Sequence, residues 1–273
     1  MCSKNVSVVI TALIDAYTGE SLSDLSLDPF KTKAQPNWRV TYDGLTKLAS
    51  VKKYFKQFNI SHQYRSTLNT NYVRNLNYTE NENGLPNAID ASEQENFIPR
   101  NQINTVTIQE NLSPLIGFDM TIKTTKSNDP QVKVEVKRDR TIALGLSNLQ
   151  ITETKSNSLV LGVGYKLTEV RNLFGRKRSN LPFKTPKNTS INLRADLTIR
   201  DNVTLIRKIE ERQNQPTAGQ RLFSIKSSID YVVNDKLNVR FFYDHQINQP
   251  KISTSFPTSN INAGIALRFT LNS

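Results

Sequence analysis

An unbroken two-residue alternation of apolar and polar side chains constrains the fold of this chain more than any other feature. The apolar residues Val132, Val134, Val136, Ile142, Leu144 and Leu146 are all even-numbered. The apolar residues Ile191, Leu193, Leu197, Ile199, Val203, Leu205 and Ile209 are likewise all odd-numbered. Successive side chains of a strand point to opposite faces, so a slip of one residue would exchange the two faces. Each stretch therefore predicts one long strand, uninterrupted at Asp139-Arg140 and at Asp201-Asn202.

Shorter stretches with the same alternation fill most of the remaining chain. They lie at 37–45, 58–65, 116–122, 159–165, 223–233, 237–243 and 260–271. Ordinary strands have about 5–6 residues, whereas strands of about 12 to 20 residues with one apolar and one charged face are typical of a tall membrane barrel with a polar lumen. A soluble sandwich would need shorter strands and denser Gly and Pro turns. The predicted fold is all-β, an antiparallel meander of about nine long strands in a transmembrane β-barrel.

Two segments are expected in the domain organisation. Residues 1–36 are predicted to be a lead-in segment, with a short helix at Val8–Tyr17 closed by Gly19 and then a connector. Residues 37–273 are predicted to be the β-barrel segment. Its long loops are predicted at Asn75–Arg100, Glu210–Gly219 and Asn248–Ser259. If the last strand ends in the periplasm, all three loops are expected on the outside of the cell.

Aromatic residues on the apolar faces are expected near strand ends. They are Tyr64, Tyr165, Tyr231, Tyr243 and Phe269. Rings at these levels would form the aromatic girdle that flanks the lipid-facing band of a membrane barrel.

Composition excludes several classes of protein. Hydrophobic residues make up 37% of the chain and the mean hydropathy is −0.49. No apolar run approaches the roughly 20 residues of a membrane-spanning helix, which excludes a helical membrane bundle. The single cysteine, Cys2, excludes a disulfide framework and a multi-cysteine zinc site. The net charge is +12, but the basic residues stand singly along the strands and their densest cluster, Arg176-Lys177-Arg178, lies in a predicted loop, so no nucleic-acid partner is predicted.

No constellation of residues points to catalysis or to a cofactor. The only two histidines are His62 and His245, for which packing roles are expected. No nucleophile elbow, P-loop, HExxH helix or EF-hand loop is found. The run Gly162-Val163-Gly164 lies inside a predicted strand, where it cannot form a phosphate cradle. The chain is predicted not to be an enzyme and to need no cofactor or metal.

The final strand carries a recognisable pattern of its own. It combines a polar residue, a glycine, an apolar residue and an aromatic residue at Asn262, Gly264, Leu267 and Phe269. This pattern resembles the C-terminal signal of bacterial outer-membrane β-barrels. The resemblance implies that these residues are read by the barrel-assembly machinery.

Several longer runs resemble one family over most of residues 30–273. They are PNWRVTYDGL at 36–45, SHQYRST at 61–67, LSPLIGFD at 112–119, NLRADLTIRDN at 192–202, NQPTAG at 214–219 and QPKISTSFPTS at 249–259. The family is that of the giant outer-membrane translocons of the type IX secretion system, called SprA in gliding bacteria and Sov elsewhere. The loop at 75–103 and the beginning of the chain match it weakly.

This resemblance implies a pore that passes folded cargo proteins across the outer membrane of Gram-negative cells to the cell surface. Members are far longer than this chain, which is therefore expected to be the C-terminal part of one. The implied partners are outer-membrane lipid, the secreted cargo, a small barrel shuttle and a periplasmic plug protein. Two alternatives stay open: another outer-membrane channel, for lipopolysaccharide assembly or uptake, and a soluble β-rich surface adhesin.

Overall fold

The computed structural model describes residues 6–18, 36–83, 86–87, 89–90, 96–98, 100–124, 128–168, 170, 190–234, 237–252 and 255–270. Its helices are α1 (Val6–Thr18), the 3-10 helix η3 (Gly44–Lys47) and α2 (Ala49–Lys52). Its strands are β1 (Trp38–Tyr42), β2 (Phe55–Arg74), β3 (Ile89–Asp90), β4 (Asn96–Phe97), β5 (Asn101–Ile122), β6 (Gln131–Gly145), β7 (Gln150–Thr168), β8 (Ser190–Lys208), β9 (Gln213–Asn234), β10 (Leu237–Pro250) and β11 (Thr258–Phe269).

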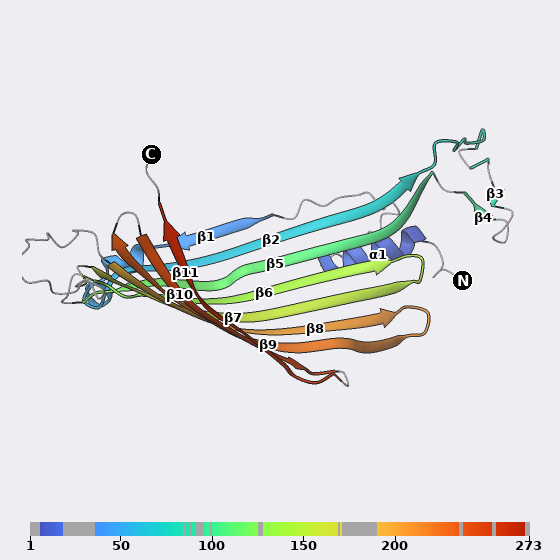
Figure 1. Cartoon of the computed structure of the whole chain (residues 1–273). Coiled ribbons are helices and arrows are strands. Elements are labelled where there is room, and N and C mark those ends of the chain that lie inside the picture. The colour runs from blue at the N-terminus through green and yellow to red at the C-terminus, as the bar shows by residue number, and fades with distance from the viewer. Residues whose placement is uncertain are drawn as a thin grey trace, which may run out of the picture.

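Nine of these strands form one antiparallel meander in the order β1-β2-β5-β6-β7-β8-β9-β10-β11. The predicted all-β meander of long strands is confirmed. Figure 1 shows the sheet as a strongly twisted, open array, with the small β3–β4 hairpin beyond the ends of β2 and β5. The edge strands β1 and β11 each pair with one described strand and not with each other, so the sheet does not close on itself.

The two long strands inferred from unbroken alternation are confirmed. β6 runs through positions 139–140, and β8 runs through positions 201–202 for a length of 19 residues. β6 pairs with β7, and β7 with β8, without any register irregularity. Paired residues lie on the same face of a sheet, so the apolar positions of all three strands share one face. We call this the apolar face and the opposite one the polar face.

β5 contains an irregularity that leaves the two faces intact. Leu112 pairs with Arg138 and Ile116 pairs with Val136, so β5 advances four residues where β6 advances two. The excess is an even number of residues, and the side chains beyond it therefore return to the same face. The extra residues include Pro114, which follows a cis peptide bond and has no backbone N–H to offer to a sheet.

Several strand boundaries differ from those expected. β1 ends at Tyr42 because η3 and α2 form a compact turn into β2, which itself extends to Arg74. β7 begins at Gln150, well before the expected start at Leu159. β9 begins at Gln213, so the loop predicted at Glu210–Gly219 is wrong, and a short turn at 209–212 replaces it.

The helix expected near the N-terminus is confirmed as α1, while Gly19 and the connector lie outside the described residues. α1 packs on the apolar face at one end of the sheet, which we call the α1 end; Figure 1 shows the helix across the ends of β5 and β6 there. One face of the helix supplies Ile10, Leu13 and Ile14. The strand residues beneath are Ile103, Val106, Ile108, Ile142, Leu144 and Leu146. These residues form the main hydrophobic core of the described chain.

We predict that Ile10→Ala will weaken the docking of α1. Ile10 is completely buried, and truncating such a side chain usually costs about 2–5 kcal/mol. Hydrogen exchange of the α1 amides should accelerate while the amides of β6 and β7 keep their protection. Leu48→Ala, at a position that is 55% exposed, is the matched control. Unchanged exchange of the α1 amides in Ile10→Ala would contradict the assigned core.

Candidate membrane-facing site

A broad band of apolar side chains, many of them exposed and Tyr231 and Val239 buried, crosses the apolar face of the sheet between the α1 end and the opposite end. We call it the apolar belt. It runs from Ile191 to Ile199 on β8, from Phe223 to Tyr231 on β9, from Leu237 to Ile247 on β10 and from Ile261 to Phe269 on β11. Its exposed members are Trp38, Val40, Tyr42, Ile116, Val163, Ile225, Ile229, Phe241, Tyr243, Ile261, Ile265, Leu267 and Phe269.

The belt has a sharp edge on the side of α1. Cross-strand pairing places six apolar residues in one transverse row: Ile116, Val136, Leu159, Ile199, Phe223 and Ile247. In the next row on the same face every position from β6 to β10 is polar: Arg138, Asn157, Asp201, Arg221 and Gln249. On β5 this row contains Leu112, which pairs with Arg138. The band of exposed apolar surface is therefore bounded by the sheet's register and is not a scatter of single residues.

The predicted aromatic girdle is only partly found. Tyr165 and Phe269 lie near the ends of β7 and β11, but Tyr64 and Tyr243 lie well inside β2 and β10. Tyr231 is only 3% exposed, because it packs in a second core cluster with neighbours on β9 and β10. The strands continue past the belt, so the edge of the belt and the end of a strand do not coincide.

On the polar face a row of charges of alternating sign crosses the sheet at the level of the belt. Cross-strand pairing joins Asn59, Asp119, Lys133, Gly162, Asp196, Lys226, Asp244 and Asn262 in this row. Opposite charges in neighbouring strands stabilise a sheet and its register. The sequence did not point to this row, because its members are far apart in the chain and only the register brings them together.

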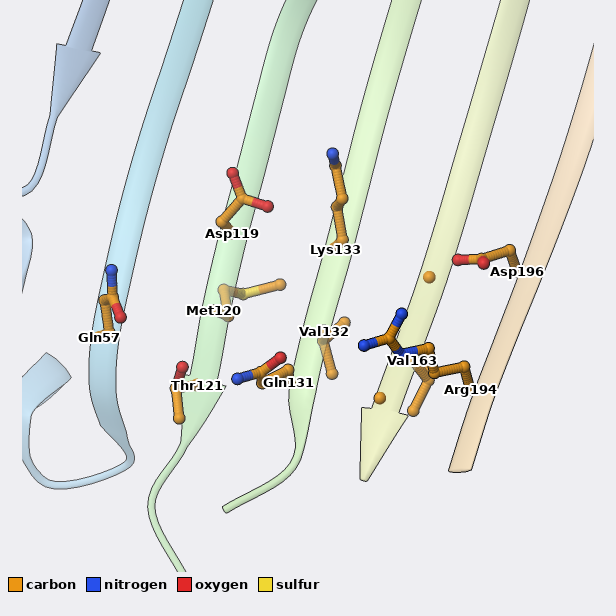
Figure 2. Close-up of a pocket in the computed structure, with 12 residues that line it drawn as sticks. Gln57, Asp119, Met120, Thr121, Gln131, Val132, Lys133, Val163, Arg194 and Asp196 are labelled. Carbon is orange, nitrogen blue, oxygen red and sulfur yellow. The ribbon is translucent and has the colours of Figure 1, made fainter. Parts of the chain in front are cut away.

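A hollow lies on the polar face between β2 and β8, at the end opposite α1. Figure 2 shows Lys133 between Asp119 and Asp196 at its rim. Gly162 occupies the intervening position on β7, where an added Cβ would lie 2.7 Å from Oδ1 of Asp196. The absence of a side chain at Gly162 therefore leaves room for the Asp196 carboxylate.

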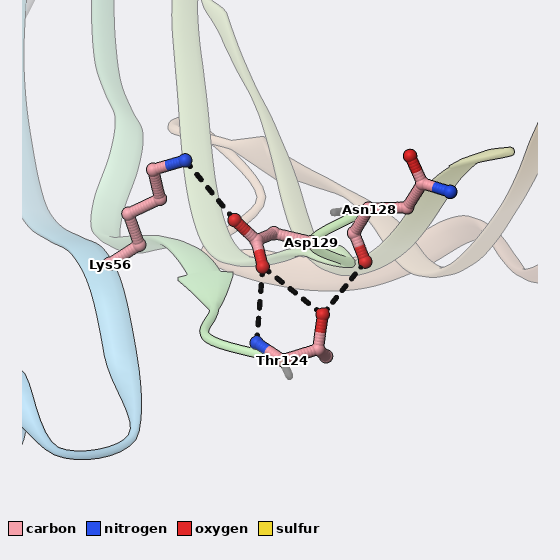
Figure 3. Close-up of polar contacts among 4 residues, drawn as sticks. All are labelled: Lys56, Thr124, Asn128 and Asp129. Carbon is pink, nitrogen blue, oxygen red and sulfur yellow. Dashed lines mark hydrogen bonds and ion pairs between the residues drawn. The ribbon is translucent and has the colours of Figure 1, made fainter. Parts of the chain in front are cut away.

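The turn between β5 and β6 is fixed by a small polar cluster, shown in Figure 3. The backbone N–H of Thr124 donates a hydrogen bond of 3.0 Å to the carboxylate of Asp129, and Nζ of Lys56 lies 3.2 Å from the same group. These two donors, the Thr124 amide first, hold the pKa of Asp129 below its ordinary value of 3.8. Asp129 therefore stays ionised at neutral pH and ties β2 to the turn.

The residues of the predicted barrel-insertion signal all lie on the edge strand β11. Leu267 and Phe269 are on the apolar face and are 64% and 66% exposed. Asn262 and Gly264 are on the polar face, paired with Asp244 and Phe242. The Phe242 ring covers Gly264 so closely that an added Cβ would lie 2.8 Å from Cζ. The structure thus accounts for the glycine by packing, and the role of these residues in insertion stays a prediction.

Both histidines have hydrogen-bond partners. Nδ1 of His62 donates to the carbonyl oxygen of Leu115 at 2.6 Å. Nε2 of His245 lies 2.9 Å from the hydroxyl of Ser259. His62 thus links β2 to the irregular part of β5, and His245 links β10 to β11. These contacts fit the packing roles expected for both rings.

Two further findings concern the described residues as a whole. No helix among them has the length and hydropathy needed to cross a membrane. No group of three His, Cys, Asp or Glu side chains within the described ranges is placed to hold a metal ion. No protein-family model matches the chain, and no curated protein matches its sequence.

We predict that Gly264→Ala will lower the free energy of unfolding by about 1–3 kcal/mol, because the new methyl group overpacks against Phe242. Gly164→Ala is the matched control. Gly164 lies on the polar face in the same transverse row as Phe242 and Gly264. A Cβ added at Gly164 would make only ordinary contacts, at 3.8 Å. Denaturant titration of both variants measures the difference.

Repeating Gly264→Ala in a Phe242→Ala background completes a double-mutant cycle. The cost of the glycine substitution should largely disappear when the ring is absent. An equal cost in both backgrounds would show that the ring does not determine the requirement for glycine.

Proposed function

We propose that this chain forms part of the wall of an outer-membrane β-barrel, with the apolar belt against lipid. The observation that carries the proposal is the depth of the belt. A membrane-spanning β-strand needs about 9–11 residues, and the belt runs from Phe223 to Tyr231 on β9 and from Leu237 to Ile247 on β10. A soluble protein would leave this continuous apolar band in water, where contiguous patches above a few hundred Å² are rare.

The polar face supports a water-filled lumen on the other side of the same strands. Barrel strands alternate apolar residues outwards with polar residues inwards, and the transverse row from Asp119 to Asp244 is charged where the belt behind it is apolar. Its signs alternate, so this level of the wall has little net charge. Such a wall would let cargo of either sign pass without strong binding.

A closed barrel requires strands beyond these nine. β1 and β11 leave two edges of unpaired backbone groups, and each unsatisfied group costs several kcal/mol in lipid. We propose that neighbouring strands pair with both edges, which gives a barrel much larger than a nine-stranded one.

The sequence resemblance supports a more specific proposal about the type of barrel and its partners. The runs at 36–45, 112–119 and 192–202 support a segment of the protein-conducting translocon of the type IX secretion system, with folded cargo, a small barrel shuttle and a periplasmic plug as partners. Another outer-membrane channel would share the two faces of this sheet, and the resemblance favours the translocon.

Arginine at neighbouring positions of β8 tests which face meets lipid. Leu197 lies on the apolar face and Thr198 on the polar face at the same depth. Leu197→Arg should destabilise the inserted protein by roughly 2–4 kcal/mol, as arginine does near the bilayer midplane, and should reduce secretion of cargo. Thr198→Arg should be tolerated. Heat-modifiable gel migration and cargo at the cell surface are the measurements; equal tolerance of both substitutions would exclude a lipid-facing belt.

Cysteine labelling tests the orientation. If β11 ends in the periplasm, the β8–β9 turn faces the outside and the turn before β2 faces the periplasm. In a Cys2→Ser background, Glu211→Cys should react with a membrane-impermeant thiol reagent on intact cells. Lys53→Cys should react only after the outer membrane is permeabilised. Both positions are exposed turn residues, and the reverse labelling pattern would overturn the proposed orientation.

A further inference from the structure

A band of basic side chains lies on the apolar face directly beyond the apolar belt, on the side of α1. We call it the basic collar: Arg138, Arg140, Lys155, Arg207, Arg221 and Lys251. Arg138 and Arg221 stand in the first row beyond the belt, and Arg140 and Lys155 stand in the next row. The collar therefore crosses the sheet from β6 to the end of β10.

The carboxylates of this band lie beneath its cations. Glu153 is 2% exposed, whereas its partners Lys155 and Arg207 are 46% and 40% exposed, at distances of 3.0 and 2.9 Å. Asp201 is likewise less exposed than Arg221 and Lys251, which both pair with it. Arg140 covers Glu110 in the same way. The outer surface of the collar is thus basic, with six cations above three carboxylates.

One cation of the collar has no partner of this kind. Arg138 is exposed and makes no ion pair with any residue in the described part of the chain. Its guanidinium presents several donors in a planar fork, which suits the oxygens of a phosphate group. An exposed arginine next to an apolar belt is therefore available to an anionic ligand.

The distance of the collar from the belt matches one layer of a membrane. The first two collar rows lie two and four residues beyond the belt, or about 7 and 13 Å along a strand. For strands tilted by about 45° this corresponds to about 5 and 9 Å above the hydrocarbon edge. The headgroup layer of a bilayer occupies roughly the first 5–8 Å beyond that edge. The basic side chains of these two rows therefore stand at the level of lipid phosphates, whereas Arg207 lies two rows further from the belt.

We propose that the basic collar binds the phosphate groups of anionic lipids in the leaflet on the side of α1. The proposal rests on the proposed function, because it requires the belt to lie in a bilayer. In the orientation proposed above, this leaflet is the outer one, where phosphorylated lipid A is the anionic lipid. Charge complementarity and direct continuity with the belt select a membrane lipid over a soluble anion as the occupant.

The test compares lipid retention by the intact protein in nanodiscs of phosphatidylcholine with and without lipid A. Native mass spectrometry counts the lipid A molecules that stay bound. Arg138→Gln combined with Arg221→Gln removes two cations without stranding a carboxylate, since Asp201 keeps Lys251. Each basic residue at an anionic surface contributes about fivefold, so the double variant should bind lipid A about thirtyfold more weakly.

Arg194→Gln combined with Arg200→Gln is the matched control, because it removes the same charge from exposed residues of the polar face. This control should retain lipid A like the wild type. Equal retention by both double variants, or equal loss, would overturn the proposal. Full displacement of lipid A by inorganic phosphate at equal concentration would also overturn it, in favour of a free-anion site.

The proposed function and lipid binding by the collar are distinguished by different outcomes of this experiment. A wild-type protein that carries the strands needed to close the barrel and still does not enter nanodiscs of phosphatidylcholine alone would refute the proposed function, and the collar proposal with it. A protein that enters these nanodiscs but does not enrich lipid A would refute the collar proposal alone.

Discussion

Continuous antiparallel pairing from β1 to β11 is the constraint on which every surface of this molecule depends. The register between β6 and β8 has no irregularity, and the irregularity in β5 adds an even number of residues. Apolar and polar side chains thus stay on their own faces along the middle of the sheet, because the one-residue shifts, such as that between Thr204 and Leu205, lie near strand ends. A slip of one residue in a single strand would place charge in the belt and interrupt the row from Asp119 to Asp244 at once.

The parts of the fold that the sequence predicted are those where apolar residues mark one face. β6 and β8 were recognisable because nearly all of their large apolar residues keep one parity, Ile206 near the end of β8 being the exception. The first half of β7 was missed because Glu153, Lys155 and Asn157 occupy its apolar face, and no apolar period remains to detect. The start of β9 was missed because Pro216 and Gly219 look like turn residues, although a register shift accommodates this stretch within the strand.

Some features of the candidate site could likewise be predicted from the sequence and others could not. Composition and alternation were enough to predict an apolar face, and the terminal pattern drew attention to Gly264. The alternating charges of the polar face and the basic collar could not be predicted, because each joins residues from four or more strands. Their members become neighbours only through the register, which depends on turn lengths and on irregularities such as that between Leu112 and Ile116. The helix α1 was expected from the sequence, but its position on the apolar face was not.

If the belt lies in a bilayer as proposed, the position of α1 has a consequence for insertion depth. Without the helix, the sheet would expose two apolar zones on one face, the belt and the patch around Val106, Ile142 and Leu144, separated by charged rows. A bilayer could then settle at either zone, and a chain in the wrong position would carry its charged rows to the wrong level. By burying the second zone under Ile10 and Leu13, the helix leaves one vertical position available to the membrane.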